Sequence, residues 1–208
     1  MFSAIRDLLF TPTCIGCSAL GLHVCSTCLD GICPQTSTNI PGLEQVISAS
    51  TYGGWLRDAI IEYKNGGRRQ VYGLAQVLNR VLLSYNFDCD AMFVPMPSSA
   101  AKVATRGFDT INLLVRECMK LQADDLRFAG NALVTCREVV DQVGLSAAAR
   151  QKNVAHSMQA RQRVSETVLL VDDVITTGST MREAARVLHL AGAKKVFGIS
   201  LCGSGKWG

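Results

Sequence analysis

The sequence has no long apolar run, because no stretch of its 208 residues approaches the ~20 consecutive apolar positions that a membrane-spanning helix requires. Its N-terminal residues do not predict a secretory signal either, since Arg6 and Asp7 interrupt the apolar patch and no small-residue cleavage site follows. No internal repeat or low-complexity tract occurs. We therefore expect a globular, cytoplasmic protein without a membrane segment.

Strong net charge is missing as well. The formal charge is +4, and only 18% of the residues are charged. This small excess is compatible with phosphate binding but is far below that of a dedicated nucleic-acid-binding domain. The 48% hydrophobic content can form one core of ordinary domain size plus a small appendage. We expect a boundary near residue 40, between a module at 1–40 and a domain at 41–208.

Cysteine is abundant, and its spacing predicts a metal site in the module. The nine cysteines are an odd number, and without a secretory signal they favour metal over disulfides. Two C-x-x-C pairs, seven residues apart, can supply four thiolates to one tetrahedral structural Zn²⁺. The expected ligands are Cys14, Cys17, Cys25 and Cys28. Redox-active or simply reduced cysteines are the alternative, with His23 and Cys33 as spare ligands.

Residues 168–180, VLLVDDVITTGST, carry the strongest functional signal. A β-branched run typical of a buried parallel strand is followed at once by Asp172 and Asp173. A loop of small and hydroxyl residues then leads into a helix at 181–190, whose free N–H groups and dipole favour a phosphate. The alternative is an ordinary polar turn, but two adjacent acids repel each other unless a cation or a hydroxyl-rich ligand is near.

The rest of the chain alternates strands and helices, which predicts an α/β fold with a parallel sheet and ligand loops at the carboxyl ends of its strands. Further helices are expected at 55–63, 71–85 and 108–121, and further strands at 91–94, 132–135 and 196–201.

Three more segments are expected to reach the same edge of the sheet. In Pro95-Met96-Pro97-Ser98, backbone N–H groups could face a pyrophosphate, although a rigid loop without a ligand is the alternative. Arg106 with Gly107 puts a cation just before a helix, where a solvated charge is also common. The polar stretch 137–153 has the character of a lid. Its polar residues include Arg137, Gln142, Arg150 and Asn153.

In their order, these motifs resemble the type I phosphoribosyltransferases and, over nearly the whole chain, the ComF (ComFC/GntX) family of amidophosphoribosyltransferase-like proteins linked to bacterial DNA uptake. The resemblance implies a Rossmann-like parallel sheet that binds phosphoribosyl pyrophosphate (PRPP) with Mg²⁺. It implies that Asp172 and Asp173 hold the ribose hydroxyls and that the loop holds the 5′-phosphate. The implied PRPP-binding residues are Pro95, Met96, Pro97, Ser98, Arg106, Asp172, Asp173, Thr176, Thr177, Gly178, Ser179 and Thr180.

If the protein is an enzyme, we expect Asp172, Asp173, Lys64 and Arg137 to be catalytic, with phosphoribosyl transferred to a nitrogen acceptor and pyrophosphate released. The enzymes that salvage 6-oxopurines usually carry an Asp where this chain has Thr176, which disfavours nucleobase salvage. The sequence does not identify the acceptor.

The alternative function is that of a non-catalytic PRPP sensor or a competence factor that binds single-stranded DNA or a helicase. Basic residues Lys64, Arg68 and Arg69 are candidates for that contact, although a solvated helix end is the favoured explanation of these charges. The chain also departs from the family pattern: Asp109-Thr110 replaces Asn-Gln, and no aromatic residue follows Asn153 closely.

Overall fold

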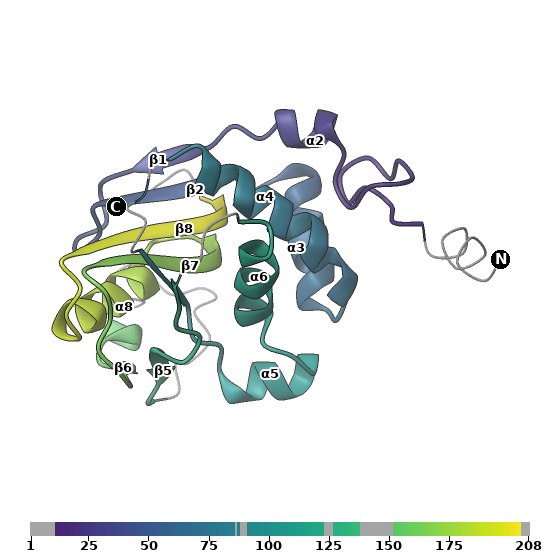
Figure 1. The fold of residues 1–208 in the computed structure, drawn as a ribbon. Coiled ribbons are helices and arrows are strands. Elements are labelled where there is room, and N and C mark those ends of the chain that lie inside the picture. Colours follow the sequence, from purple (N-terminus) through teal and green to yellow (C-terminus); the bar gives the residue numbers. More distant parts are fainter. Residues whose placement is uncertain (1–10, 86, 88–90, 123–126, 138–151, 205–208) are drawn as a thin grey trace.

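The computed structural model describes residues 11–85, 87, 91–122, 127–137 and 152–204. Its centre is a six-stranded sheet in the order β1-β2-β8-β7-β3-β4, in which every neighbouring pair except β1 and β2 is parallel (Figure 1). The strands are β1 (Gln35–Ser37), β2 (Gln45–Thr51), β3 (Met92–Pro95), β4 (Arg127–Phe128), β7 (Thr167–Ile175) and β8 (Lys195–Gly203). The predicted α/β class with a mainly parallel sheet is confirmed.

Helices pack on both faces of this sheet (Figure 1). They are α3 (Gly54–Lys64), α4 (Val71–Leu83) and α6 (Thr110–Met119) on one face and α8 (Ser179–Leu190) on the other. Successive side chains of a strand point to opposite faces. In β7, Leu169 and Val171 therefore join the core under α3, α4 and α6, whereas Val168 and Leu170 join the core under α8. Burial on both faces explains why this strand is an unbroken apolar run.

Shorter elements complete the described part of the chain. They are the helical segments α2 (Ser26–Asp30), η1 (Arg68–Gln70) and α5 (Ala100–Arg106) and the strands β5 (Leu133–Thr135) and β6 (Met158–Ala160). No helix in the described ranges is long and apolar enough to cross a membrane.

The structure differs from the sequence expectation at several short elements and, more consequentially, at β5, β2 and α5. The strand expected at 132–135 forms, as β5, but it pairs antiparallel with β6 in a separate two-stranded sheet instead of joining the parallel one. Strand β2 was not predicted, because polar Ser48 interrupts its pattern. Ser48 is fully buried, and its hydroxyl is satisfied by the Ser200 hydroxyl at 2.6 Å on the neighbouring strand. Helix α5 was also not predicted.

Candidate functional site

A cavity of about 490 Å³ lies where the carboxyl ends of β3 and β7 meet the first turn of α8. Its wall also includes residues from α3, the loop after β3, α5, the first turn of α6, the β5–β6 sheet and the segment just before β6. Of the residues predicted from the sequence, those that line it are Lys64, Met96, Pro97, Ser98, Arg106, Asp172, Asp173 and Thr180. These side chains lie about a hundred positions apart in the chain at the most. They meet here because the loops that follow parallel strands all lie at the same edge of the sheet.

The two adjacent carboxylates approach the cavity from opposite faces of the sheet. Strand β7 continues through both of them to Ile175, so Asp173 follows Val171 toward α3 and Asp172 follows Leu170 toward α8. On the α3 side, the Lys64 ammonium lies 2.8 Å from Asp173 Oδ1. The backbone N–H of Asp173 donates to Asp172 Oδ1 at 2.9 Å. The pair therefore straddles the edge of the sheet, with a cation held against one member.

The surroundings of Asp172 favour the protonated form of its carboxyl group. Desolvation raises the pKa of Asp172 to about 7, and the negative charge of Asp173 adds to the rise. The positive charge of Lys64 opposes it. A ligand that donates hydrogen bonds to Asp172 favours its ionised form, so ligand binding and proton release are coupled at this residue.

The turn between β7 and α8 is built around Gly178, which adopts a left-handed conformation with φ 75° and ψ 0° and precedes the first residue of the helix. A Cβ added there would lie 2.3 Å from Ile40 Cδ1 and 2.8 Å from its Cγ1, so glycine is needed for close approach as well as for conformation. The Thr177 and Ser179 hydroxyls lie 3.1 Å apart. Thr180 reaches the cavity, whereas Ser179 lines a neighbouring hollow.

The loop after β3 is fixed by hydrogen bonds at both ends. The Met96 N–H donates to the Val171 carbonyl at 2.8 Å, and the Ser98 hydroxyl donates to Asp109 Oδ1 at 3.1 Å. Asp109 is itself the N-cap of α6, because it accepts hydrogen bonds from the backbone N–H and the side-chain amide of Asn112 at 3.1 and 2.8 Å. The departure from the family pattern at position 109 therefore keeps a polar side chain that holds the loop.

Two cations on α5 face the cavity. Arg106 is the last residue of this helix, and Lys102 is one turn before it, so both lie on one face. Lys102 was not predicted as a site residue, although the sequence carried a signal for the helix. Ser99 caps it by accepting from the Lys102 N–H, and Gly107 ends it in the left-handed conformation.

The predicted catalytic residue Arg137 is not among the described residues that line the cavity. Its Nη2 donates instead to the carbonyl oxygens of Asn153 and Ala155, at 2.7 and 2.9 Å. It thereby joins the two ends of the polar stretch. Gln142 and Arg150, which were expected in the same stretch, lie outside the described residues.

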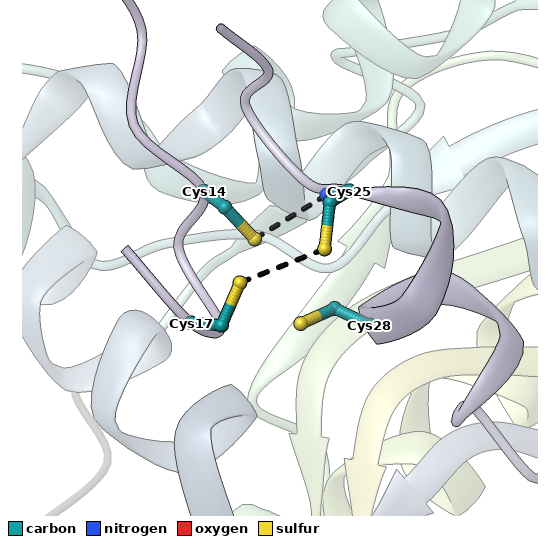
Figure 2. A group of neighbouring side chains, drawn as sticks. All are labelled: Cys14, Cys17, Cys25 and Cys28. Carbon is teal, nitrogen blue, oxygen red and sulfur yellow. Dashed lines mark hydrogen bonds between the residues drawn. The ribbon is translucent and has the colours of Figure 1, made fainter. Parts of the chain in front are cut away.

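The four cysteines predicted as metal ligands converge on one point (Figure 2). All four sulfur atoms lie within 4.8 Å of one another, and the Cys17 and Cys25 sulfurs are 3.6 Å apart. Four thiolates around a tetrahedral Zn²⁺, with Zn–S near 2.3 Å, would have sulfur atoms roughly 3.8 Å apart. Gly16 shapes the cradle, because a Cβ there would lie 2.6 Å from the Cys28 sulfur. The cluster therefore fits a structural zinc ion.

Backbone donors prepare one of these sulfurs for metal binding. Burial raises the pKa of the Cys14 thiol, but hydrogen bonds from surrounding backbone N–H groups outweigh it and lower the pKa to about 6. The N–H groups of Gly16 and Cys25 lie 3.4 and 3.3 Å from this sulfur. The thiolate is the form that binds zinc. His23, a spare ligand in the sequence interpretation, lies against Tyr72 instead, with ring centroids 4.9 Å apart and ring planes tilted by 34°.

Comparison with known proteins agrees with this architecture. Residues 119–205, which hold all of β7, α8 and β8, match the phosphoribosyl transferase domain. The chain is 26% identical over 210 residues to the DNA utilization protein YhgH of Escherichia coli, covering 96% of this chain and 86% of that protein. It is 27% identical over 154 residues to the competence protein ComFC of Streptococcus pneumoniae (73% and 64%). It is 29% identical over 107 residues to the competence protein F of Haemophilus influenzae (50% and 46%). The chain carries a phosphoribosyl transferase domain and resembles competence and DNA utilization proteins of the ComF type.

Proposed function

We propose that this protein binds PRPP with Mg²⁺ in the cavity at the ends of β3 and β7. The observation that carries the proposal is the pair of carboxylates that straddles the sheet edge beside the first turn of α8. Asp172 and Asp173 accept hydrogen bonds from the two ribose hydroxyls, and the turn at 176–180 takes the 5′-phosphate on the free N–H groups of the helix. Lys102 and Arg106 face the pyrophosphate with the loop 96–99.

Catalysis at this site is transfer of the phosphoribosyl group to a nitrogen acceptor. The bond between C1′ and pyrophosphate breaks, the leaving group keeps the electron pair, and the acceptor nitrogen bonds to C1′; an acceptor that carries a proton on this nitrogen releases it to solvent. When bound, Mg²⁺ neutralises part of the pyrophosphate charge. The chain contributes Lys102 and Arg106 as cations for the departing anion, and Lys64 holds Asp173 in place.

A non-catalytic PRPP sensor is the second candidate, and one observation favours it. Asp172 and Asp173 are the only carboxylates among the described residues that line the cavity, and both are assigned to the ribose. No further acid or base in that set is placed to take a proton from the acceptor, in keeping with Thr176 at the position where salvage enzymes have Asp. In this case, PRPP occupancy would report the metabolic state to a partner.

We assign the biological role to DNA uptake or utilisation, as the names of the relatives suggest, with single-stranded DNA or a competence helicase as the partner. We place a zinc-binding module and its linker at 1–40, before a phosphoribosyltransferase-like domain at 41–208; the linker contributes β1 to the edge of the central sheet. Of the basic candidates for DNA contact, Arg68 lies with its guanidinium 5.7 Å from the Phe108 ring centroid.

The test is a PRPP titration with and without Mg²⁺, followed by an assay of pyrophosphate release. Asp172→Asn with Asp173→Asn removes the charge-assisted hydrogen bonds, each of which contributes roughly 1.5–3 kcal/mol. PRPP binding should be lost while the circular dichroism spectrum is unchanged. Asp58→Asn, on the exposed surface of α3, is the matched control. Saturable binding without pyrophosphate release over many acceptors would favour the sensor, and unaltered affinity in the double variant would place the site elsewhere.

A further inference from the structure

Two hollows lie along α8 outside the PRPP cavity, with volumes of about 590 and 450 Å³. They share Arg186 and Leu190, which are one helical turn apart and form a ridge between them. We call the two hollows and this ridge the α8 groove. The groove borders the cavity, because Val154 lines both the cavity and the first hollow, and Met158 lines both the cavity and the second.

The rim of the α8 groove is cationic. Four exposed arginines line it: Arg161, Arg163, Arg182 and Arg186. The single carboxylate among the described lining residues, Glu183, is buried and bound by Arg186 in a bidentate pair, with N···O distances of 2.9 and 2.8 Å. An anionic partner would therefore meet an excess of positive charge.

Between these cations the surface is apolar. Leu190 is 79% exposed on the ridge, although it is a large hydrophobic side chain, and Pro41, Val187 and Ala191 lie in the adjoining walls. No Phe, Tyr or Trp is among the described lining residues, whereas grooves for single-stranded nucleic acid commonly offer aromatic rings on which the bases stack. Arginine beside an apolar centre is instead characteristic of protein interfaces.

One wall of the groove is held rigidly. Both ring nitrogens of His189 lie within hydrogen-bonding distance of carbonyl oxygens, Nδ1 at 2.9 Å from Ala193 and Nε2 at 2.8 Å from Gly42. In the tautomer protonated at Nε2, the histidine donates to Gly42 and ties the segment before β2 to the end of α8. A wall that is fixed before binding loses less conformational entropy when a partner docks.

We propose that the α8 groove is a docking surface for an acidic, leucine-containing segment of a partner protein. The carboxylates of the segment pair with the rim arginines, and its leucine side chains cover Leu190 and fill the two hollows. This inference does not depend on PRPP binding, because the rim arginines and Leu190 lie outside the proposed ribose and phosphate contacts; of the described groove residues, Ser179 alone also belongs to the proposed phosphate turn.

The experiment is a fluorescence-anisotropy titration of the full chain with three labelled probes. They are a short peptide of Glu, Asp and Leu, a peptide of Glu, Asp and Ser, and a short oligothymidylate. The leucine-containing peptide should bind, more weakly as salt is raised. Arg163→Glu with Arg182→Glu should weaken it about tenfold or more, since charge reversal replaces attraction by repulsion at two positions. Arg80→Glu with Lys120→Glu, which reverses two exposed charges on the other layer of the fold, should leave the affinity unchanged.

Leu190→Ser provides a second variant that leaves every charge in place, and it should also weaken the leucine-containing peptide. Unchanged urea midpoints of all variants check that they fold. Equal affinity for the leucine-free peptide would refute the apolar part of the proposal. If the leucine-containing peptide does not bind at low salt, the whole proposal is refuted. If oligothymidylate binds and the Arg163→Glu, Arg182→Glu variant loses that binding, the groove is a nucleic-acid site instead.

Discussion

Replacing Gly178 by alanine tests how the turn before α8 is built. Gly178 has φ 75° and ψ 0°, a left-handed conformation that costs a residue with a Cβ about 1–2 kcal/mol. The new methyl group would also lie 2.3 Å from Ile40 Cδ1, and Ile40 is buried, so its displacement adds about 1–3 kcal/mol of overpacking. We therefore expect the free energy of unfolding to fall by roughly 2–5 kcal/mol.

Gly107→Ala separates the two contributions. Gly107 has nearly the same backbone angles, φ 79° and ψ −1°, but a Cβ there would meet nothing within 4 Å. Urea unfolding should therefore give about 1–2 kcal/mol for this variant, from conformation alone. Ile40→Val, which deletes Cδ1, should recover part of the loss in the Gly178→Ala background although it destabilises the unmodified chain. Equal losses for the two alanine variants, or no coupling between positions 40 and 178, would refute the close approach of these two residues.

Three further predictions concern the metal, the protonation of the site and DNA. The Cys14→Ser variant should lose bound zinc and stability together, because structural Zn²⁺ contributes ~10 kcal/mol or more of folding free energy. Metal analysis of the unmodified chain, purified under reducing conditions, should find stoichiometric zinc. Its absence would contradict the zinc site. The pKa of Asp172 is raised to about 7, so PRPP affinity should fall by up to about tenfold for each pH unit below that value. Calorimetric titrations at several pH values measure this change. The Asp172→Asn variant should no longer show it. The same shift makes the chain less stable as the pH rises from 3.8 toward 7, because the folded state holds this proton more tightly than the unfolded chain. For single-stranded DNA, the slope of log affinity against log salt concentration should become shallower by about one unit for each phosphate contact that Arg68→Ala with Arg69→Ala removes. If the unmodified chain does not bind single-stranded DNA at low salt, direct DNA binding is excluded.

The segment from β7 through α8 could be predicted from the sequence because its signals are local. A buried parallel strand, a glycine turn and an amphipathic helix each leave their own pattern within a few residues. The four cysteines were predictable for the same reason, since spacing alone restricts how two C-x-x-C pairs can meet.

Other parts of the site depend on interactions between distant residues. Strand β2 is hidden by Ser48, whose burial is tolerable only because Ser200 lies opposite it on β8. The pairing of β5 with β6 joins segments separated by the polar stretch 137–153, so sequence periodicity gives no information about which sheet β5 enters. Lys102 was missed because its direction depends on α5, a short helix with no buried residue and hence no apolar pattern.

The placement of Asp172 and Asp173 on opposite faces of β7 also limits how this strand can change. Successive side chains of a strand point to opposite faces of the sheet. Deleting or inserting one residue within 167–171 would therefore turn every side chain on one side of that position to the opposite face. The carboxylate now beside Lys64 would then point toward α8, and apolar side chains would change layers with it. Insertions or deletions in β7 keep both the core and the two carboxylates on their faces only when they involve an even number of residues. The length of β7 is therefore constrained by the site as well as by the fold.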